Sequence, residues 1–342
     1  MNKPKPELNK TVTLHKGWAS LYSAAQKQLG IPSTHRKDNL ILNDRLDLNE
    51  LRRELYYLTQ QNGGELFPIA CAQHVGPLTF GAFSTALWTA SNLNTALQII
   101  AEHSIIISSA IKLELHYDNL GNVEVWIMDY ETLAEKRVTY LGRTLYIATL
   151  VQIVQSIAMN KTCEVQIKLT NQLGTESSLS MLQLMNNTLV EANHPLNKIC
   201  IKKQNLWSNN IHYDTELHYA ALNLVRKQAE TLKKNDLILK IYNILNELDN
   251  LSQVSANSIS KALYINVRTL NRKLSQMNTS YRGIIEGYRK EKALHLLQSS
   301  SSNITEVAFQ LGYADLSSFS RAFKRWTGTS PMQIKPSSLT KK

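Results

Sequence analysis

The most regular pattern of hydrophobic and polar positions lies near the C-terminus, at residues 303–331. Its first half repeats apolar residues at helical spacing, namely Ile304, Val307, Ala308 and Leu311. Gly312 then permits a turn with a positive φ at low cost. Asp315 can cap a second helix, in which Phe319 and Phe323 lie four residues apart on one inward face. The stretch predicts a helix-turn-helix unit.

A second unit of the same kind lies upstream. Its inward residues are Ile259, Ala262 and Leu263 in the first helix and Leu270, Leu274 and Met277 in the second. A turn at Tyr264 and Ile265 separates these helices, and Asn266 can cap the second one. Between the two units, residues 280–297 form one predicted helix, which spans roughly 27 Å. Such a helix can hold two recognition helices about one duplex turn, ~34 Å, apart.

The polar face of each second helix carries side chains suited to DNA. The predicted contacts to base edges are Arg268, Asn271, Arg272, Ser317, Ser320 and Arg321. Arg and Asn have donors that match guanine and adenine edges in the major groove. The predicted phosphate contacts, which position the protein without specifying sequence, are Lys273, Lys324 and Arg325. The alternative for both sets is a solvated helix face without a partner.

These spacings resemble the double helix-turn-helix domain of AraC/XylS-type bacterial transcription regulators, over about the last 105 residues. The positions that carry the resemblance include Arg268, Leu270, Arg272, Arg289, Ala293, Gly312, Tyr313, Phe323, Ser330 and Pro331. The resemblance implies a sequence-specific regulator that binds double-stranded DNA and contacts RNA polymerase. It also implies an unidentified small-molecule effector and a location in the bacterial cytoplasm, on the nucleoid when DNA is bound.

The first two thirds of the chain have a mixed pattern, which predicts an α+β domain with helices and a small antiparallel sheet. Period-two alternation predicts strands at residues 111–117, 123–127, 165–169 and 199–201, the first two joined as a hairpin. Helical spacing predicts helices at residues 17–29, 48–60, 141–158 and 217–232. With a linker near residues 233–236, we expect a sensing or dimerisation domain at residues 1–230 and an all-α DNA-binding domain at residues 236–338.

Residues 74–97 and the hairpin that follows them resemble the arabinose-binding-like, non-cupin N-terminal domain of ornithine-utilisation-type regulators in the same family. The stretch runs from His74-Val75-Gly76 to Thr95-Ala96-Leu97. The resemblance implies a domain that senses a signal, dimerises or does both. It identifies neither a ligand nor the residues that would bind one.

Two apolar surfaces in the N-terminal part are candidates for a homodimer interface. The helix at residues 144–158 is apolar nearly all round, which is typical of a helix buried in a core or at a subunit interface. The second candidate is the stripe Leu217, Ala221 and Leu224. If the first helix belongs to the core, the stripe alone would carry a dimer.

The formal charge of +11 is concentrated in the C-terminal third. Residues 236–342 contain 15 Lys and Arg against 7 Asp and Glu, whereas residues 1–235 contain 23 against 20. This imbalance favours an anionic partner for the C-terminal part. No run of apolar residues approaches the length of a membrane span, and the N-terminus lacks the pattern of a signal peptide.

Motifs of enzymes are missing from the sequence, so we expect no catalytic residue, cofactor or metal site. The nearest constellation, at residues 212–218, places two His with Asp214 and Glu216; it suits a solvated segment better than a metal site. The three cysteines are widely spaced, as in a chain with reduced thiols. The alternative function is a DNA-repair or small-molecule enzyme fused to the DNA-binding tail, with Cys163 as a candidate alkyl acceptor.

Overall fold

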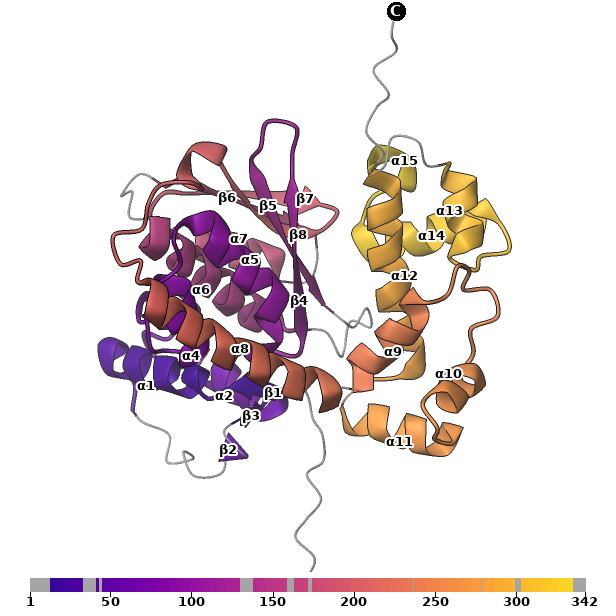
Figure 1. The fold of residues 1–342 in the computed structure, drawn as a ribbon, viewed down its shortest axis with the longest axis horizontal. Coiled ribbons are helices and arrows are strands. Elements are labelled where there is room, and N and C mark those ends of the chain that lie inside the picture. Colours follow the sequence, from indigo (N-terminus) through magenta and orange to yellow (C-terminus); the bar gives the residue numbers. More distant parts are fainter. Residues whose placement is uncertain are drawn as a thin grey trace, which may run out of the picture.

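The chain folds into two lobes that lie side by side (Figure 1). The computed structural model describes residues 13–32, 41–42, 45–129, 138–158, 163–171, 174–235, 237–277, 279–298 and 303–334. The predicted linker residue Asp236 and the end of the predicted second domain, residues 335–338, lie outside these ranges. Within them, no helix is both long and apolar enough to cross a bilayer.

The N-terminal lobe combines eight described α-helices with two sheets. Its helices are α1 (Gly17–Leu29), α2 (Leu48–Thr59), α3 (Phe67–Gln73), α4 (Ala82–Trp88), α5 (Leu93–His103), α6 (Tyr140–Ala158), α7 (Thr175–Leu182) and α8 (Thr215–Asn235). The small sheet has the order β1-β3-β2, with strands β1 (Thr13–His15), β2 (Ile41–Leu42) and β3 (Arg45–Asp47). The large sheet has the order β4-β5-β8-β6-β7, with strands β4 (Ile111–Tyr117), β5 (Val123–Asp129), β6 (Val165–Thr170), β7 (Thr188–His194) and β8 (Asn197–Ile201).

The predicted α+β class is confirmed, and so is the hairpin, in which Ile111 pairs with Asp129 and Tyr117 with Val123. One pair departs from the antiparallel expectation, since β6 and β7 run parallel. The crossover between them is α7, which the polar run of residues 174–187 did not predict. The mostly buried helix α6 packs in the N-terminal core, with Leu145, Val151 and Ile153 almost fully buried, and so its apolar surface is core rather than a free interface.

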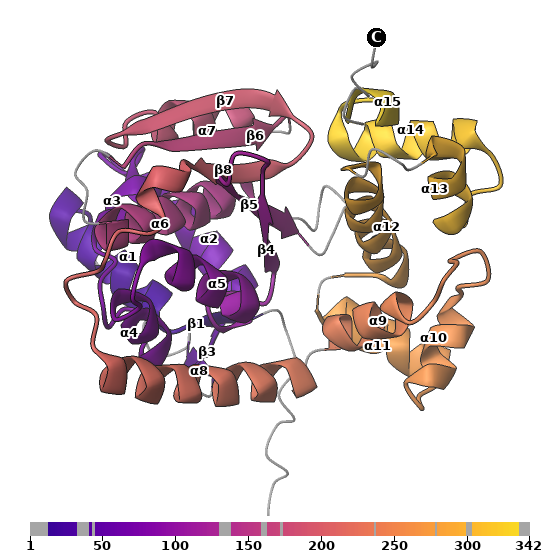
Figure 2. The same ribbon diagram turned by 45° about the horizontal axis from the view of Figure 1, so that its top comes forward.

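The C-terminal lobe is all-α, as predicted. Its helices are α9 (Leu237–Asn246), α10 (Ala256–Ala262), α11 (Val267–Gln276), α12 (Tyr281–Gln298), α13 (Ile304–Gln310), α14 (Leu316–Thr327) and α15 (Pro331–Ile334). The pairs α10–α11 and α13–α14 are the two helix-turn-helix units, and α12 joins them (Figure 2). In α10 Ser260 is buried, while Ala262, expected to face inward, is exposed. Tyr264 makes the turn that follows, with a φ of 56°.

Strand β5 is buried on both faces. Val123, Val125 and Ile127 pack into the N-terminal core, whereas Trp126 and Met128 on the opposite face pack with the buried residues of α9–α14. An antiparallel sheet usually leaves one face in water. Here the C-terminal lobe covers that face, and both views show α12 beside the edge formed by β4 and β5 (Figures 1 and 2).

The turn between α13 and α14 packs against the connection between α9 and α10. The backbone N–H of Leu251 donates to the carbonyl of Gln310 at 3.1 Å. Gly312 has a φ of +79°, and a Cβ at this position would lie 2.7 Å from the carbonyl group of Leu251 and 2.8 Å from the nitrogen of Ser252. The glycine therefore serves both the turn and the close approach of the two units.

We expect Gly312→Ala to lower the free energy of unfolding by about 1–3 kcal/mol more than Gly328→Ala, because a methyl group must displace backbone atoms. Gly328 is the matched control, since its φ is +78° and nothing lies near its Cβ position. Gly328→Ala should lower the free energy of unfolding only by the cost of the left-handed conformation, about 1–2 kcal/mol. Denaturant unfolding of the two variants measures the difference; equal losses would show that the contact with Leu251 is unimportant.

Candidate DNA-binding surface

Helices α11 and α14 are built in the same way. Each begins after a capping side chain: Asn266 Oδ1 accepts from the Thr269 backbone N–H at 2.7 Å, and Asp315 Oδ1 accepts from that of Ser318 at 2.7 Å. Both caps were predicted from the sequence. They start the two helices at equivalent positions and thereby fix which residues face outward.

The inward faces of the two helices also correspond. In α11 Leu270 and Leu274 are fully buried, and in α14 Phe319 and Phe323 take the same places. Counting from the first helical residue, the second, fifth and sixth positions then lie on the outer side of each helix. These positions are Arg268, Asn271 and Arg272 in α11 and Ser317, Ser320 and Arg321 in α14.

The structure leaves nearly all the predicted contact residues accessible. Exposed side chains are Arg268, Asn271, Arg272, Lys273, Ser317, Arg321, Lys324 and Arg325, and only Ser320 is half-buried. Arg321 donates to the Ser318 hydroxyl at 3.3 Å, a bond to an exposed neutral group that a base edge can replace. Within the described chain, neither Arg268 nor Arg272 has an acidic partner. Their roles as base or phosphate contacts stay predictions.

A groove between the two units adds basic groups that the sequence had not assigned to DNA contact. It has a volume of about 410 Å³ and is lined by Arg282, Arg289 and Arg325 together with Tyr281 and Tyr313. Arg282 and Arg289 lie seven residues apart on α12, and this spacing is the signal that could have identified them. Its arginines come from α12 and α14, so the groove lies beside the helix that joins the two units.

One carboxylate, Glu286, organises the charges of this groove. It pairs with the Arg282 Nε at 3.2 Å and with Arg325 at 3.5 Å. Arg325 is therefore partly neutralised in the free protein, unlike Lys324 beside it. Arg289 lies over the Tyr313 ring, 5.1 Å from its centroid. Burial raises the pKa of Tyr313, although Arg289 opposes the shift, so the phenol keeps its proton as a donor.

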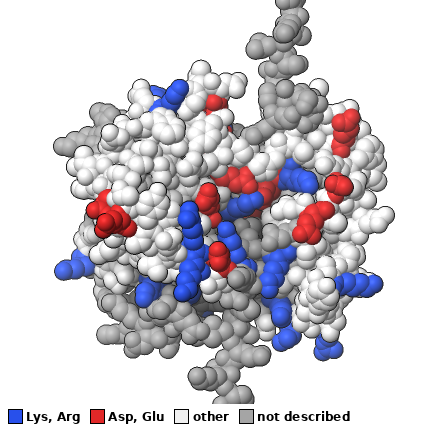
Figure 3. Space-filling view, in the orientation of Figure 1, with Lys and Arg blue, Asp and Glu red and all other residues white. Residues whose placement is uncertain are grey.

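The surface charge agrees with this arrangement. In Figure 3, Lys and Arg gather on the lower part of the visible face, on both sides of the junction between the lobes and around α11. On the right-hand lobe, acidic side chains lie higher, around α13, while others lie at the left of the face and among the basic groups at the junction. The basic side of the C-terminal lobe is thus the side of the first recognition helix.

The constellation at residues 212–218 forms no site. His212, Asp214 and Glu216 are exposed, and only Glu216 lies in α8, which begins at Thr215. His218 is buried, and its Nδ1 lies 3.1 Å from the carbonyl oxygen of Ala86. The expectation of a solvated segment therefore holds for the three exposed residues and not for His218.

The N-terminal lobe contains one small apolar cavity of about 40 Å³, bordered by Trp18, Leu55 and Leu145 among others. The hydroxyl groups of Tyr22 and Tyr146 are buried at its wall and have no hydrogen-bond partner among the described residues. Burial raises the pKa of both phenols. This space has room for about a water molecule. A larger pocket of about 530 Å³ in the same lobe is lined by His15, Glu54 and Gln228 among others.

A family model described as a helix-turn-helix domain matches residues 259–336. Over 78 residues the chain is 40% identical to the HTH-type transcriptional regulator VqsM of Pseudomonas aeruginosa, covering 23% of this chain and 24% of VqsM. The Ornithine utilization regulator of the same organism is 38% identical over 72 residues, 21% of each protein. The match thus spans about a quarter or less of these curated relatives. The crystal structure of the transcriptional regulator CdpR from Pseudomonas aeruginosa aligns with 94% of this chain and 98% of its own, at a TM-score of 0.47 and 19% identity.

The paired units and their matching outer faces define a DNA-binding helix-turn-helix domain. Residues 259–336 are such a domain of the AraC type, as found in transcription regulators. The resemblance that the spacings indicated is confirmed for this part of the chain.

We expect Arg272→Ala and Arg321→Ala to relax base preference in two different parts of the DNA site, about one helical turn apart. Each change should cost on the order of 1–3 kcal/mol at its preferred base pair, because a bidentate contact to the base edge is lost. Selection from a random duplex library measures the preference. Lys324→Ala is the control, which should weaken all sequences evenly. An Arg variant that selects the parental motif would not have lost a base contact.

Proposed function

We propose that this chain is a sequence-specific transcription regulator whose helices α11 and α14 enter two successive major grooves of one duplex. The observation that carries the proposal is that the two helices are built alike. In each, a cap and a buried pair place the second, fifth and sixth residues on the outer side. Arg268, Asn271 and Arg272 would bind base edges in one groove. Ser317, Ser320 and Arg321 would do so in the other.

The backbone between these grooves would bind at the arginine groove beside α12. Arg282, Arg289 and Arg325 supply positive charge there, and Lys273 and Lys324 supply it at the flanking recognition helices. Phosphate contacts of this kind provide affinity and register, and base contacts provide specificity. DNA binding would also weaken the ion pair between Arg325 and Glu286, because a phosphate competes for the same guanidinium.

The N-terminal lobe, by the same proposal, senses a small-molecule effector, and the DNA-bound protein contacts RNA polymerase. Both partners rest on the family resemblance. The pocket beside His15, Glu54 and Gln228 supports the first, because its volume of about 530 Å³ is that of a small-molecule site. A thermal-shift screen of the full chain against amino acids, sugars and fatty acids identifies the effector class, since a bound ligand stabilises the folded state.

The alternative of a DNA-repair enzyme has no support from the cysteines. Burial raises the pKa of Cys71, Cys163 and Cys200, whereas a nucleophilic cysteine needs an accessible thiolate. Cys163, the candidate alkyl acceptor, is 1% exposed. The named relatives are transcription regulators. We therefore favour the role of regulator without catalysis.

The proposed function predicts that DNA binding by the full chain weakens steeply with salt, with a slope of about −0.9 per phosphate contact in a plot of log affinity against log salt. Lys273→Ala and Lys324→Ala should each reduce the slope by about one contact. Lys202→Ala is the control, because Lys202 is an exposed lysine of the N-terminal lobe that pairs with Glu164. Affinity that does not change with salt, or no binding to duplex DNA, contradicts the proposal.

We further propose that the protein forms a homodimer through the outer face of α8. Leu217 and Leu224 are 49% and 56% exposed, whereas Ala221, the third member of the predicted stripe, is buried against the lobe. Tyr219 on the same helix is also exposed. A dimer would double the recognition helices and raise affinity for paired sites through effective concentration.

Sedimentation of the full chain tests this interface. The parent should run as a dimer at micromolar concentration, and Leu217→Lys with Leu224→Lys should convert it to a monomer, because two charges cannot be buried unpaired. Leu189→Lys is the control, since this leucine of β7 is similarly exposed at 51%. A monomeric parent, or a dimer unaffected by the double change, contradicts the α8 interface.

A further inference from the structure

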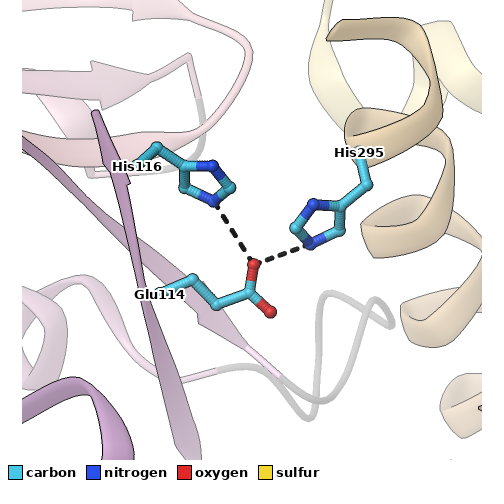
Figure 4. A group of neighbouring side chains, drawn as sticks. All are labelled: Glu114, His116 and His295. Atoms are coloured by element: carbon cyan, nitrogen blue, oxygen red, sulfur yellow. Dashed lines mark ion pairs between the residues drawn. The ribbon is translucent and has the colours of Figure 1, made fainter. Parts of the chain in front are cut away.

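Two elements from different lobes bring metal-binding side chains together. Glu114 and His116 are two residues apart on β4, so their side chains lie on the same side of the strand. His295 projects toward them from α12, the helix that joins the two helix-turn-helix units (Figure 4). Because His295 is far from the other two in sequence, the three residues form no motif that could have been found without the fold.

The ligand atoms are close enough for one ion. Glu114 Oε2 lies 2.6 Å from His295 Nε2 and 3.4 Å from His116 Nε2, and the three side chains place their ligand atoms within 4.8 Å of one another. Zinc bonds of about 2.0–2.1 Å in a tetrahedron put neighbouring ligand atoms about 3.3 Å apart. Small side-chain rotations suffice to reach that geometry.

The surroundings already orient two of the three ligands. Lys112 Nζ lies 2.7 Å from Glu114 Oε1, which leaves Oε2 directed at the histidines. The His116 ring stacks on Trp126 with the ring centroids 3.8 Å apart. His116 Nε2 is buried without a hydrogen bond of good geometry. Outer contacts of this kind hold metal ligands in place and strengthen binding.

The local charge is compatible with a cation. Lys112 is also paired with Glu291 of α12, so two carboxylates face one ammonium group. Glu114 lies between Lys112 on one side and the two histidines on the other. The His295 side chain is 36% exposed, which gives an ion access from solvent.

We propose that Glu114, His116 and His295 bind one divalent transition-metal ion of the zinc type, with water in the remaining position. Two imidazole nitrogens and one carboxylate oxygen suit such ions, whereas magnesium and calcium prefer oxygen ligands alone. Because β4 supplies two ligands and α12 supplies the third, the ion holds the DNA-binding lobe against the sheet. The site does not depend on the proposed contacts to DNA.

Cobalt titration of the tag-free full chain tests the site. We expect one Co²⁺ per chain, with the visible absorption of a low-symmetry nitrogen and oxygen site, and displacement by Zn²⁺. Glu114→Gln, His116→Gln and His295→Gln should each weaken binding at least about tenfold. His194→Gln is the control, because His194 and Glu191 form an exposed pair at 3.2 Å that an adventitious ion would use equally.

A gain-of-signal variant covers the case in which a glutamine variant fails to fold. His295→Cys should keep metal binding and add a thiolate-to-cobalt charge-transfer band, which arises only if residue 295 is a ligand. Hydrogen exchange should slow in β4 and α12 when Zn²⁺ is added to the parent, and not in His295→Gln. Absence of stoichiometric binding, binding lost equally in His194→Gln, or a cysteine variant without the new band overturns the proposal.

Discussion

The packing of the DNA-binding lobe on the outer face of the large sheet is the constraint on which the structure depends. Trp126 and Met128 alternate with residues of the N-terminal core, so each lobe completes the burial of β5 from its own side. A buried Trp and Met together contribute several kcal/mol in apolar area removed from water, on the order of 1.5–3 kcal/mol each. Separation of the lobes would expose both side chains.

The helix that faces this sheet is also the helix that sets the distance between the two recognition helices. A shift of α12 on the sheet would therefore move both helix-turn-helix units at once. The Lys112–Glu291 ion pair and the Glu114–His295 contact link β4 to α12 by charge. An effector that changes the position of the hairpin has a direct physical route to the DNA-binding surface, without a separate hinge.

The C-terminal domain was predictable from sequence because its folding signals are local. The caps at Asn266 and Asp315, the turn at Gly312 and the buried pair Phe319 and Phe323 all lie within a few residues of the helix they define. The predicted recognition faces follow from those signals alone. By contrast, α7, β7 and the small sheet have short or polar segments whose structure is decided by long-range packing.

The junction between the lobes was not predictable for the same reason. The burial of Trp126 and the meeting of His116 with His295 depend on the placement of residues that are well separated in the chain. Periodicity correctly placed Trp126 in a strand. The alternation of Val123, Val125 and Ile127 is the same whether the opposite face of the strand meets solvent or a second lobe. The domain boundaries at residues 230 and 236 stay a proposal, supported by the change of core between Ala229 and Ile238.

The two caps are equivalent in position but differ in charge. Asn266 is neutral, whereas hydrogen bonds from Ser318 lower the pKa of Asp315 and keep it anionic. Each of the two helices presents three exposed cations, but a negative group at the start of α14 repels an approaching phosphate, whereas the cap of α11 is neutral. We expect the first unit to provide most of the residence time on DNA. The second unit would then dissociate and rebind many times during one encounter, so that it tests the sequence kinetically.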